Sequence, residues 1–222
     1  MMNLELLCRA TEFSGDKCFY DMAISHADKT MENHFRPDYS CYHVVNYDTI
    51  SGNALQKCTW QGYSDESVWS RGQSWALYGY TMMYRETKQP RYLEQAKHIA
   101  GFLLNHPKMP QDKIPYWDFD DPKVPDALRD ASAAAIMASA LLELSGYVDK
   151  VTGQGYITVA ETQLRTLASD EYLAKPGENC NFILKHSVGF LPQNSEVDVP
   201  LTYADYYFVE ALMRYRAMHL KE

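Results

Sequence analysis

The chain has 222 residues, enough for one large domain or two small ones. Apolar residues make up 46% of it and charged residues 23%, which is ordinary for a globular protein. The net charge of −8 argues against nucleic acid as a partner, and no apolar run approaches the length needed to cross a membrane.

Apolar residues recur at helical spacing in seven stretches of the chain. They predict helices at 2–13, 18–31, 72–87, 91–104, 129–147, 155–168 and 203–219. The stretch at 129–147 is apolar nearly all round, as a helix buried on both sides should be. Val44 and Val45 could form a short strand, and no block of the sequence is rich in strands.

The second, fourth and sixth of these helices share one pattern. Phe19, Tyr92 and Tyr156 are each followed four positions later by alanine and eight positions later by alanine or leucine. This spacing marks one face of a helix. Each copy follows a more apolar helix, so the sequence predicts hairpins of an inner and an outer helix, which either stack into a solenoid or close into a ring.

The seventh helix has no partner after it, so about three and a half hairpins are present. At this repeat length, a ring of six hairpins would require about 150 more residues. We therefore expect the C-terminal portion of a larger protein; a complete small α-solenoid is the alternative. An open ring would expose apolar edges, through which the chain could self-associate. The edge residues would be Leu4, Leu7 and Phe13 on the first helix and Phe208, Leu212 and Tyr215 on the last.

Residues 61–75 contain the most informative cluster of side chains. Two tryptophans, two glutamines, Asp65, Glu66 and Arg71 fall within these fifteen positions, just before a predicted helix. Indole rings can stack on a sugar, a guanidinium can bind a carboxylate, and amides can bind hydroxyl groups. The segment is therefore suited to an anionic sugar. The alternative is a helix N-terminus that is capped by its acids and packs its tryptophans inward.

Several motifs in order resemble the unsaturated glucuronyl hydrolases, glycoside hydrolase family 88. They are Tyr-His-Val-Val at 42–45, the segment 61–75, Pro-Tyr-Trp-Asp-Phe-Asp at 115–120, Arg-Asp-Ala-Ser-Ala-Ala-Ala-Ile at 129–136, Asn-Phe-Ile-Leu-Lys-His-Ser at 181–187 and Tyr-Ala-Asp-Tyr-Tyr-Phe at 203–208. The resemblance implies an all-α fold, an incomplete (α/α)6 barrel: residues 1–222 would be one domain, the C-terminal portion of the family's barrel.

The resemblance also implies a reaction and a binding site. The family adds water across the vinyl ether of a Δ4,5-unsaturated uronic acid at the non-reducing end of lyase-generated oligosaccharides, without a metal or other cofactor. Residues on the positions of the family's sugar pocket are His43, Gln61, Trp69, Arg71 and Trp75, with Tyr206 as a weaker candidate. Trp60 departs from the histidine that is common before the Gln-Gly pair.

In the family, the acid/base aspartate comes almost directly before Met-Met-Asn-Leu, and a second essential aspartate comes earlier. This chain opens on that motif, so we expect it to contain no catalytic residue and to be inactive alone. The alternative is a non-catalytic sugar-binding or assembly module. The carboxylates that could substitute are Asp65, Glu66, Asp118, Asp120 and Asp130. We expect Asp118 and Asp130 to be structural, capping helices and pairing with Arg129.

The cysteines and histidines indicate neither a metal site nor a disulfide framework. The five cysteines are odd in number and widely spaced, and the seven histidines are scattered. This usage mildly favours a reducing compartment. The location stays open between cytoplasm and periplasm, because any export signal would lie upstream.

Overall fold

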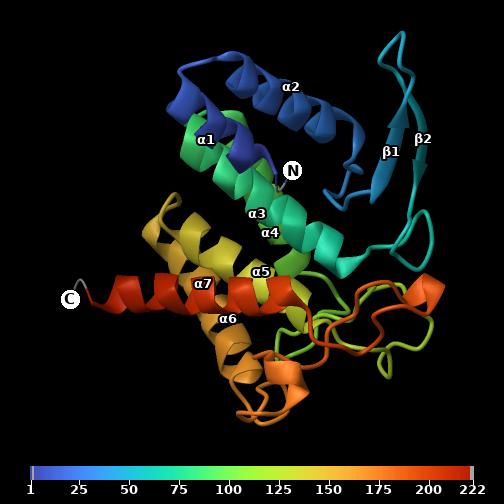
Figure 1. The fold of residues 1–222 in the computed structure, drawn as a ribbon, viewed down its shortest axis with the longest axis vertical. Coiled ribbons are helices and arrows are strands. Elements are labelled where there is room, and N and C mark those ends of the chain that lie inside the picture. The colour runs from blue at the N-terminus through green and yellow to red at the C-terminus, as the bar shows by residue number, and fades with distance from the viewer. Residues whose placement is uncertain (2, 221–222) are drawn as a thin grey trace.

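Helices dominate the structure, a computed structural model that describes residue 1 and residues 3–220 (Figure 1). The helices are α1 (Leu4–Ser14), α2 (Cys18–Asn33), α3 (Ser70–Thr87), α4 (Pro90–Leu104), α5 (Ala131–Ser145), α6 (Lys150–Leu167) and α7 (Thr202–His219). They confirm the seven predicted helices. Met2, where the first predicted helix begins, lies outside the described residues.

Most helices begin within two residues of the predicted start, and an aspartate cap sets the start of α5 and of α6. Asp130 accepts a hydrogen bond from the backbone N–H of Ser132, so α5 begins at Ala131 and not at 129. Asp149 accepts from two backbone N–H groups of α6, which begins five residues earlier than predicted. Gly153 lies in the first turn of α6, and because glycine is a poor helix former the sequence pattern does not indicate a helix there. A Cβ on it would lie 2.7 Å from a carbonyl oxygen of α5, so the glycine permits this close approach.

The repeated pattern marks the buried faces of the outer helices, as predicted. The alanine and leucine positions of α2, α4 and α6 are buried, as are Tyr92 and Tyr156, while Phe19 is half-buried. Each of these helices packs against the helix before it, and α3, α5 and α7 pack side by side. Helix α5 lies between the others, and nearly all of its residues are buried. Its alanines and serines leave room for helices on all sides.

A two-stranded antiparallel sheet projects beside α2 (Figure 1). Strand β1 (Val44–Tyr47) confirms the strand predicted at Val44 and Val45, and it pairs with β2 (Ala54–Cys58). Strand β2 escapes prediction because most of it is exposed and no apolar alternation marks it. Asp48 accepts hydrogen bonds from Ile50 and Ser51 in the connecting turn.

The long connections gather at one end of the inner helices. Segments 59–69, 105–130 and 168–201 lie where α3, α5 and α7 begin (Figure 1). Ser70 N–H donates to the carbonyl of Trp117 at 3.1 Å, and Ala131 N–H donates to that of His186 at 3.0 Å. These bonds satisfy helix-start donors and attach the connections to the helices.

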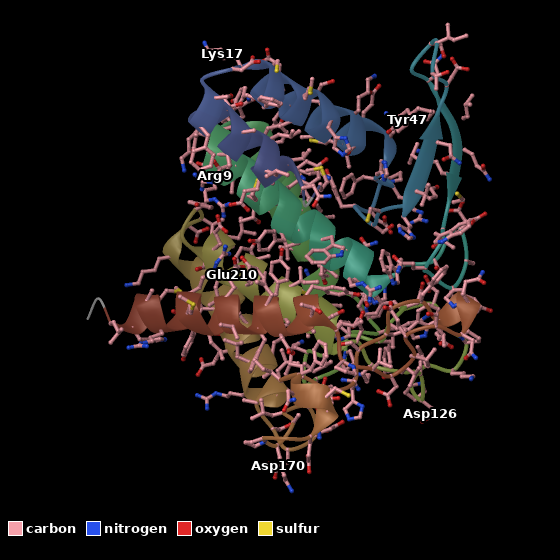
Figure 2. The ribbon with its side chains drawn as sticks, in the orientation of Figure 1. Arg9, Lys17, Tyr47, Asp126, Asp170 and Glu210 are labelled. Carbon is pink, nitrogen blue, oxygen red and sulfur yellow. The ribbon has the colours of Figure 1, made fainter. Side chains whose placement is uncertain are left out.

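A network of ion pairs joins α1, α3, α5 and α7 away from these connections; Figure 2 labels its members Arg9 and Glu210. Glu143 of α5 lies 2.9 Å from Arg85 of α3 and 2.7 Å from Arg214 of α7. Arg85 also lies 2.6 Å from Glu5 of α1. Burial by itself would lower the pKa of the Arg85 guanidinium, but the nearby carboxylates of Glu143, Glu86 and Glu5 outweigh it and raise that pKa.

Only some of the apolar residues that were expected to be exposed at the edges of α1 and α7 are exposed. Leu4 and Phe208 are buried, because α1 packs against α2 and α3 and because α7 packs against α5. Leu7 and Tyr215 are half-buried, whereas Phe13 is 89% exposed and Leu212 is 40% exposed. None of the helices among the described residues is both long and apolar enough to span a membrane.

Candidate functional site

Four of the predicted site residues share one cavity of about 250 Å3. His43, Gln61, Trp69 and Trp75 line it together with residues of α2, the segment 41–42 and the start of α3. The full lining is Met1, Thr30, His34, Phe35, Cys41, Tyr42, His43, Gln61, Trp69, Gly72, Trp75 and Ala76. Trp75 also lines a neighbouring hollow of about 520 Å3 with Met1, Asn3, Tyr203 and Tyr207.

Backbone N–H groups of residues 60 and 61 fix the imidazole of His43. Its Nδ1 accepts from the N–H groups of Trp60 at 3.1 Å and Gln61 at 3.2 Å. The proton of the neutral ring therefore sits on Nε2. The ring lies against Trp69, with centroids 4.4 Å apart. Burial and the nearby charge of Arg71 lower the pKa of His43 to about 4, so the ring is neutral at pH 7.

Trp69 is a buried part of the cavity lining. It is 6% exposed, and its indole Nε1 has no hydrogen-bond partner in the described part of the chain. A buried N–H of this kind requires an acceptor from water or a ligand. Gly72 makes room for the ring, since a Cβ there would lie 2.7 Å from Cε3 of the indole.

Gln61 and Arg71 attach a distant loop to this wall. Gln61 Nε2 donates to the carbonyl of Gly189 at 3.0 Å. Arg71 donates to the same carbonyl at 2.7 Å, to the carbonyl of Val188 and to Asp130 Oδ2 at 3.0 Å. Its guanidinium is 2% exposed and lies 4.7 Å from the centre of the Trp69 ring. Arg71 thus lies behind the cavity and is paired with Asp130.

The predicted partner of Asp130 is wrong. Asp130 caps α5 as expected, but its ionic partner is Arg71. Arg129 points the other way and pairs with Asp112. Two residues adjacent in sequence face opposite sides of an extended segment, so Arg129 and Asp130 reach different ionic partners.

Tyr206 lies apart from the cavity. It is 60% exposed and lines a different hollow with Ile183, Val209 and Met213 on the outer face of α7. Tyr203 and Tyr207 lie on the inner face instead, with ring centroids 6.0 and 5.1 Å from that of Trp75. Sequence reasoning missed both of them, although their spacing of four places them on one helix face.

The candidate carboxylates have structural partners. Asp118 is fully buried and accepts from Tyr63 N–H, Ser67 Oγ and Asp120 N–H, so it orders a loop and caps no helix. Burial raises the pKa of Asp118. Asp120 accepts from Val68 N–H, and Glu66 pairs with Arg36.

Asp65 is the candidate acid nearest to the site. It accepts from Thr59 N–H at 2.8 Å and lines a very small hollow behind His43 and Trp69. That hollow has a volume of about 10 Å3, too small for a sugar. No carboxylate lines the main cavity among the described residues. Nor does any group of three His, Cys, Asp or Glu within them lie close enough to hold a metal ion.

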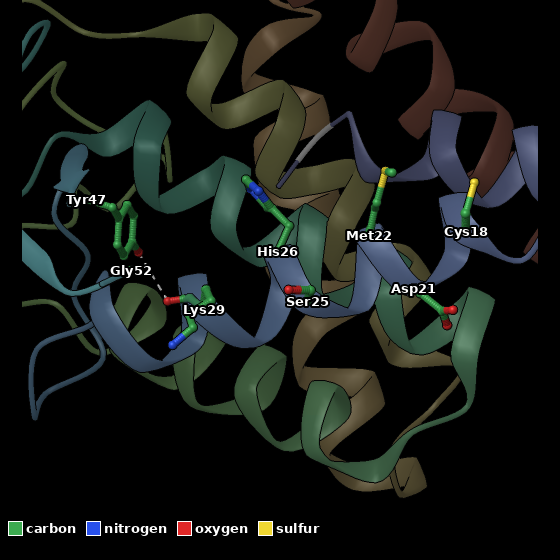
Figure 3. Close-up of a pocket in the computed structure, with 8 residues that line it drawn as sticks. All are labelled: Cys18, Asp21, Met22, Ser25, His26, Lys29, Tyr47 and Gly52. Atoms are coloured by element: carbon green, nitrogen blue, oxygen red, sulfur yellow. Dashed lines mark hydrogen bonds between the residues drawn. The ribbon is translucent and has the colours of Figure 1, made fainter. Parts of the chain in front are cut away.

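A larger groove, of about 680 Å3, lies elsewhere, between α2 and the β1–β2 turn (Figure 3). Met22, His26, Lys29 and Tyr47 are among its lining residues, and none of the predicted site residues belongs to it. Tyr47 donates to the backbone carbonyl of Lys29 at 3.4 Å across one end of the groove. The groove is wide open, and its polar side chains do not converge on one point as they do in a typical ligand site.

No family model matches the chain. An unsaturated glucuronyl hydrolase of Formosa agariphila is 52% identical over 221 residues, which are 100% of this chain and 54% of that protein. A solved unsaturated glucuronyl hydrolase specific for heparin is 58% identical with a TM-score of 0.95, over 98% of this chain and 58% of the other. A variant of the Streptococcus agalactiae unsaturated glucuronyl hydrolase, complexed with dGlcA-GalNAc6S, has a TM-score of 0.84 at 32% identity, over 96% and 56%. The chain spans about half the length of the relatives it matches, and it belongs to the family of the unsaturated glucuronyl hydrolases.

Proposed function

We propose that the chain provides one wall of a site for oligosaccharides that end in a Δ4,5-unsaturated uronic acid. In the whole protein this site would hydrate the vinyl ether of that sugar, after which the ring opens and the remaining sugar leaves. The observation that carries the proposal is the cavity of about 250 Å3 in which His43, Gln61, Trp69 and Trp75 converge. Aromatic faces with a few polar groups are the usual lining of a sugar or small-ligand site.

The polar groups of this wall suit the oxygens of a uronic acid. The Nε2–H of His43 and the unpartnered Nε1–H of Trp69 are donors for a carboxylate or hydroxyl oxygen. Arg71 acts behind them, because it is not among the residues that line the cavity and its guanidinium is held by Asp130 and by the carbonyls of Val188 and Gly189. Tyr203 and Tyr207 extend the wall in place of Tyr206.

The hairpins would form the C-terminal portion of an (α/α)6 barrel, as one domain. Hydration needs a proton donor within hydrogen-bond reach of the reacting carbon. No carboxylate of the described residues lines the cavity, which supports binding without turnover by these 222 residues alone. The same observation favours a second candidate function, a non-catalytic sugar-binding or assembly module.

The test combines binding and turnover on the purified chain. Titration with an unsaturated uronyl disaccharide would be followed by tryptophan fluorescence, and hydration by loss of the absorbance of the conjugated double bond. We expect saturable binding and no loss of absorbance. Absence of binding would refute the sugar site, and loss of absorbance would refute the inactivity of the isolated chain. If the whole protein binds but does not hydrate, the module is the better description.

A matched pair of variants tests the position of the site. Trp75→Ala removes a ring from the wall and should abolish saturable binding, whereas Tyr206→Ala removes an exposed ring on the other face of α7 and should leave the affinity unchanged. Equal effects of the two substitutions would contradict the proposed location. Circular dichroism of both variants verifies that they are folded.

We also propose that copies of the chain associate through the outer face of α7. Tyr206, Val209 and Met213 form an exposed apolar row at helical spacing there, and Leu212 lies beside it. Sedimentation of the purified chain should show concentration-dependent dimers, which Met213→Lys would dissociate. A monomer at all concentrations would exclude this association.

A further inference from the structure

Two aromatic side chains meet at the rim of the cavity without being part of its wall. Trp60 is 67% exposed, and its ring centroid lies 6.2 Å from that of the half-buried Phe190, at an interplanar angle of 36°. The two residues come from segments 130 positions apart in the chain. A large ring that stays so exposed gains little from the core, so its place requires another explanation.

Hydrogen bonds of Trp60 and of the neighbouring residues hold this aromatic pair next to the cavity. The backbone N–H of Trp60 donates to Nδ1 of His43, and the side-chain Nε2 of the next residue, Gln61, donates to the carbonyl of Gly189, which precedes Phe190. Phe190 N–H donates to Ser195 O at 3.0 Å and so closes its own loop. Each ring is therefore one residue away from a group that is fixed to the proposed site, and both are carried by anchored backbone.

We propose that Trp60 and Phe190 form a stacking platform for the second sugar, the one attached to the unsaturated uronic acid. This proposal rests on the proposed function of the cavity. A pyranose ring has an apolar C–H face that an exposed indole can cover, while the hydroxyl groups at its edge stay in water. The uronic acid would occupy the cavity beside His43 and Gln61, and its neighbour would lie over the aromatic pair. The platform would thus determine affinity for the leaving sugar and not for the uronic acid.

The test separates the two sugars by comparing two ligands. Affinities of the chain for an unsaturated uronyl disaccharide and for free glucuronate are measured by calorimetry, with Trp60→Ala, Trp60→Phe and Tyr63→Ala. Tyr63 is the matched control, because it is a nearby aromatic residue that is 50% exposed and not part of the pair. Trp60→Ala should weaken disaccharide binding about fivefold to tenfold and change glucuronate binding less than about twofold. Trp60→Phe should recover most of the loss, and Tyr63→Ala should have no effect.

Three results would overturn the platform. They are an unchanged affinity for the disaccharide in Trp60→Ala, an equal loss for both ligands, and an equal loss in Tyr63→Ala. If the wild-type chain binds neither ligand, the proposed function itself fails and the platform falls with it. If the wild-type chain binds both ligands and Trp60→Ala changes neither affinity, the platform is refuted while the proposed cavity site stands.

Discussion

The buried pair of Arg71 and Asp130 should be the most sensitive single contact of the site. Asp130→Asn keeps an oxygen that can accept from Ser132 N–H, so the cap of α5 persists and only the charge is lost. The guanidinium, 2% exposed, would then be buried with carbonyl partners alone. Breaking a buried pair in this way costs about 3–5 kcal/mol. For a chain of this length each kcal/mol lowers Tm by about 2–4 °C, so Tm should fall by roughly 6–20 °C.

Thermal melting by circular dichroism measures this effect, with Glu161→Gln as the control. Glu161 pairs with Arg165 on the exposed face of α6, where water already solvates both charges, so its loss should leave Tm unchanged. Asp130→Ala removes the cap as well and should lower the stability by about 1 kcal/mol more than Asp130→Asn does. A loss below about 1 kcal/mol in Asp130→Asn would refute the reasoning, because the carbonyls of Val188 and Gly189 would then suffice to hold the charge.

Three further predictions follow from His43, Gly189 and the cysteines. The folded state holds the pKa of His43 at about 4, below its ordinary 6.5, so the unfolded chain takes up a proton first and stability should fall as pH drops from 6.5 to 4. His43→Gln should flatten the pH dependence of urea unfolding in that window; an unchanged slope would contradict the assignment. Gly189→Ala places a Cβ 2.5 Å from that of Glu196 and should lower the urea midpoint, whereas Gly155→Ala meets nothing within 4 Å in α6 and should stabilise by about 0.5–1 kcal/mol. A higher urea midpoint for Gly189→Ala than for Gly155→Ala would show that residues 186–199 can shift to accommodate the new Cβ. Burial raises the pKa of the Cys41 thiol to about 12, so iodoacetamide at neutral pH should label exposed Cys18 and spare Cys41, as read by mass spectrometry. Equal labelling would mean that the core around Cys41 opens.

The helices could be predicted because their signal is local. The repeat of Tyr92, Ala96 and Ala100 is a property of one helix face, and burial in the structure follows it. Strand β2 could not be predicted, since its residues are mostly exposed and only pairing with β1 makes it a strand. Short-range periodicity therefore identifies elements that bury a face, and it misses elements defined by a partner.

The site could be predicted only in part, for a similar reason. Motifs placed His43, Gln61, Trp69 and Trp75 in one set, and the structure brings them to one cavity. The burial of Arg71 depends on Asp130 and on the 188–189 carbonyls, which no spacing near residue 71 reveals. On α7, Tyr203 and Tyr207 lie near Trp75 and Tyr206 does not, and the side of α7 that faces Trp75 is set by tertiary packing.

The hydrogen bonds from Gln61 and Arg71 to residues 188 and 189 have a consequence for the order of folding. They close loops of more than a hundred residues, whereas the helical hairpins form from contacts between neighbouring elements. Closing a long loop is entropically slow, so the hairpins should assemble first and the 188–189 loop should attach to Gln61 and Arg71 last. During synthesis, the anchor at Gly189 leaves the ribosome after six of the seven helices, and until then Arg71 and Gln61 lack their carbonyl partners. A chain interrupted before residue 188 would therefore keep the helices before that point and the side chains that line the cavity, but it would lack the loop that Gln61 and Arg71 hold.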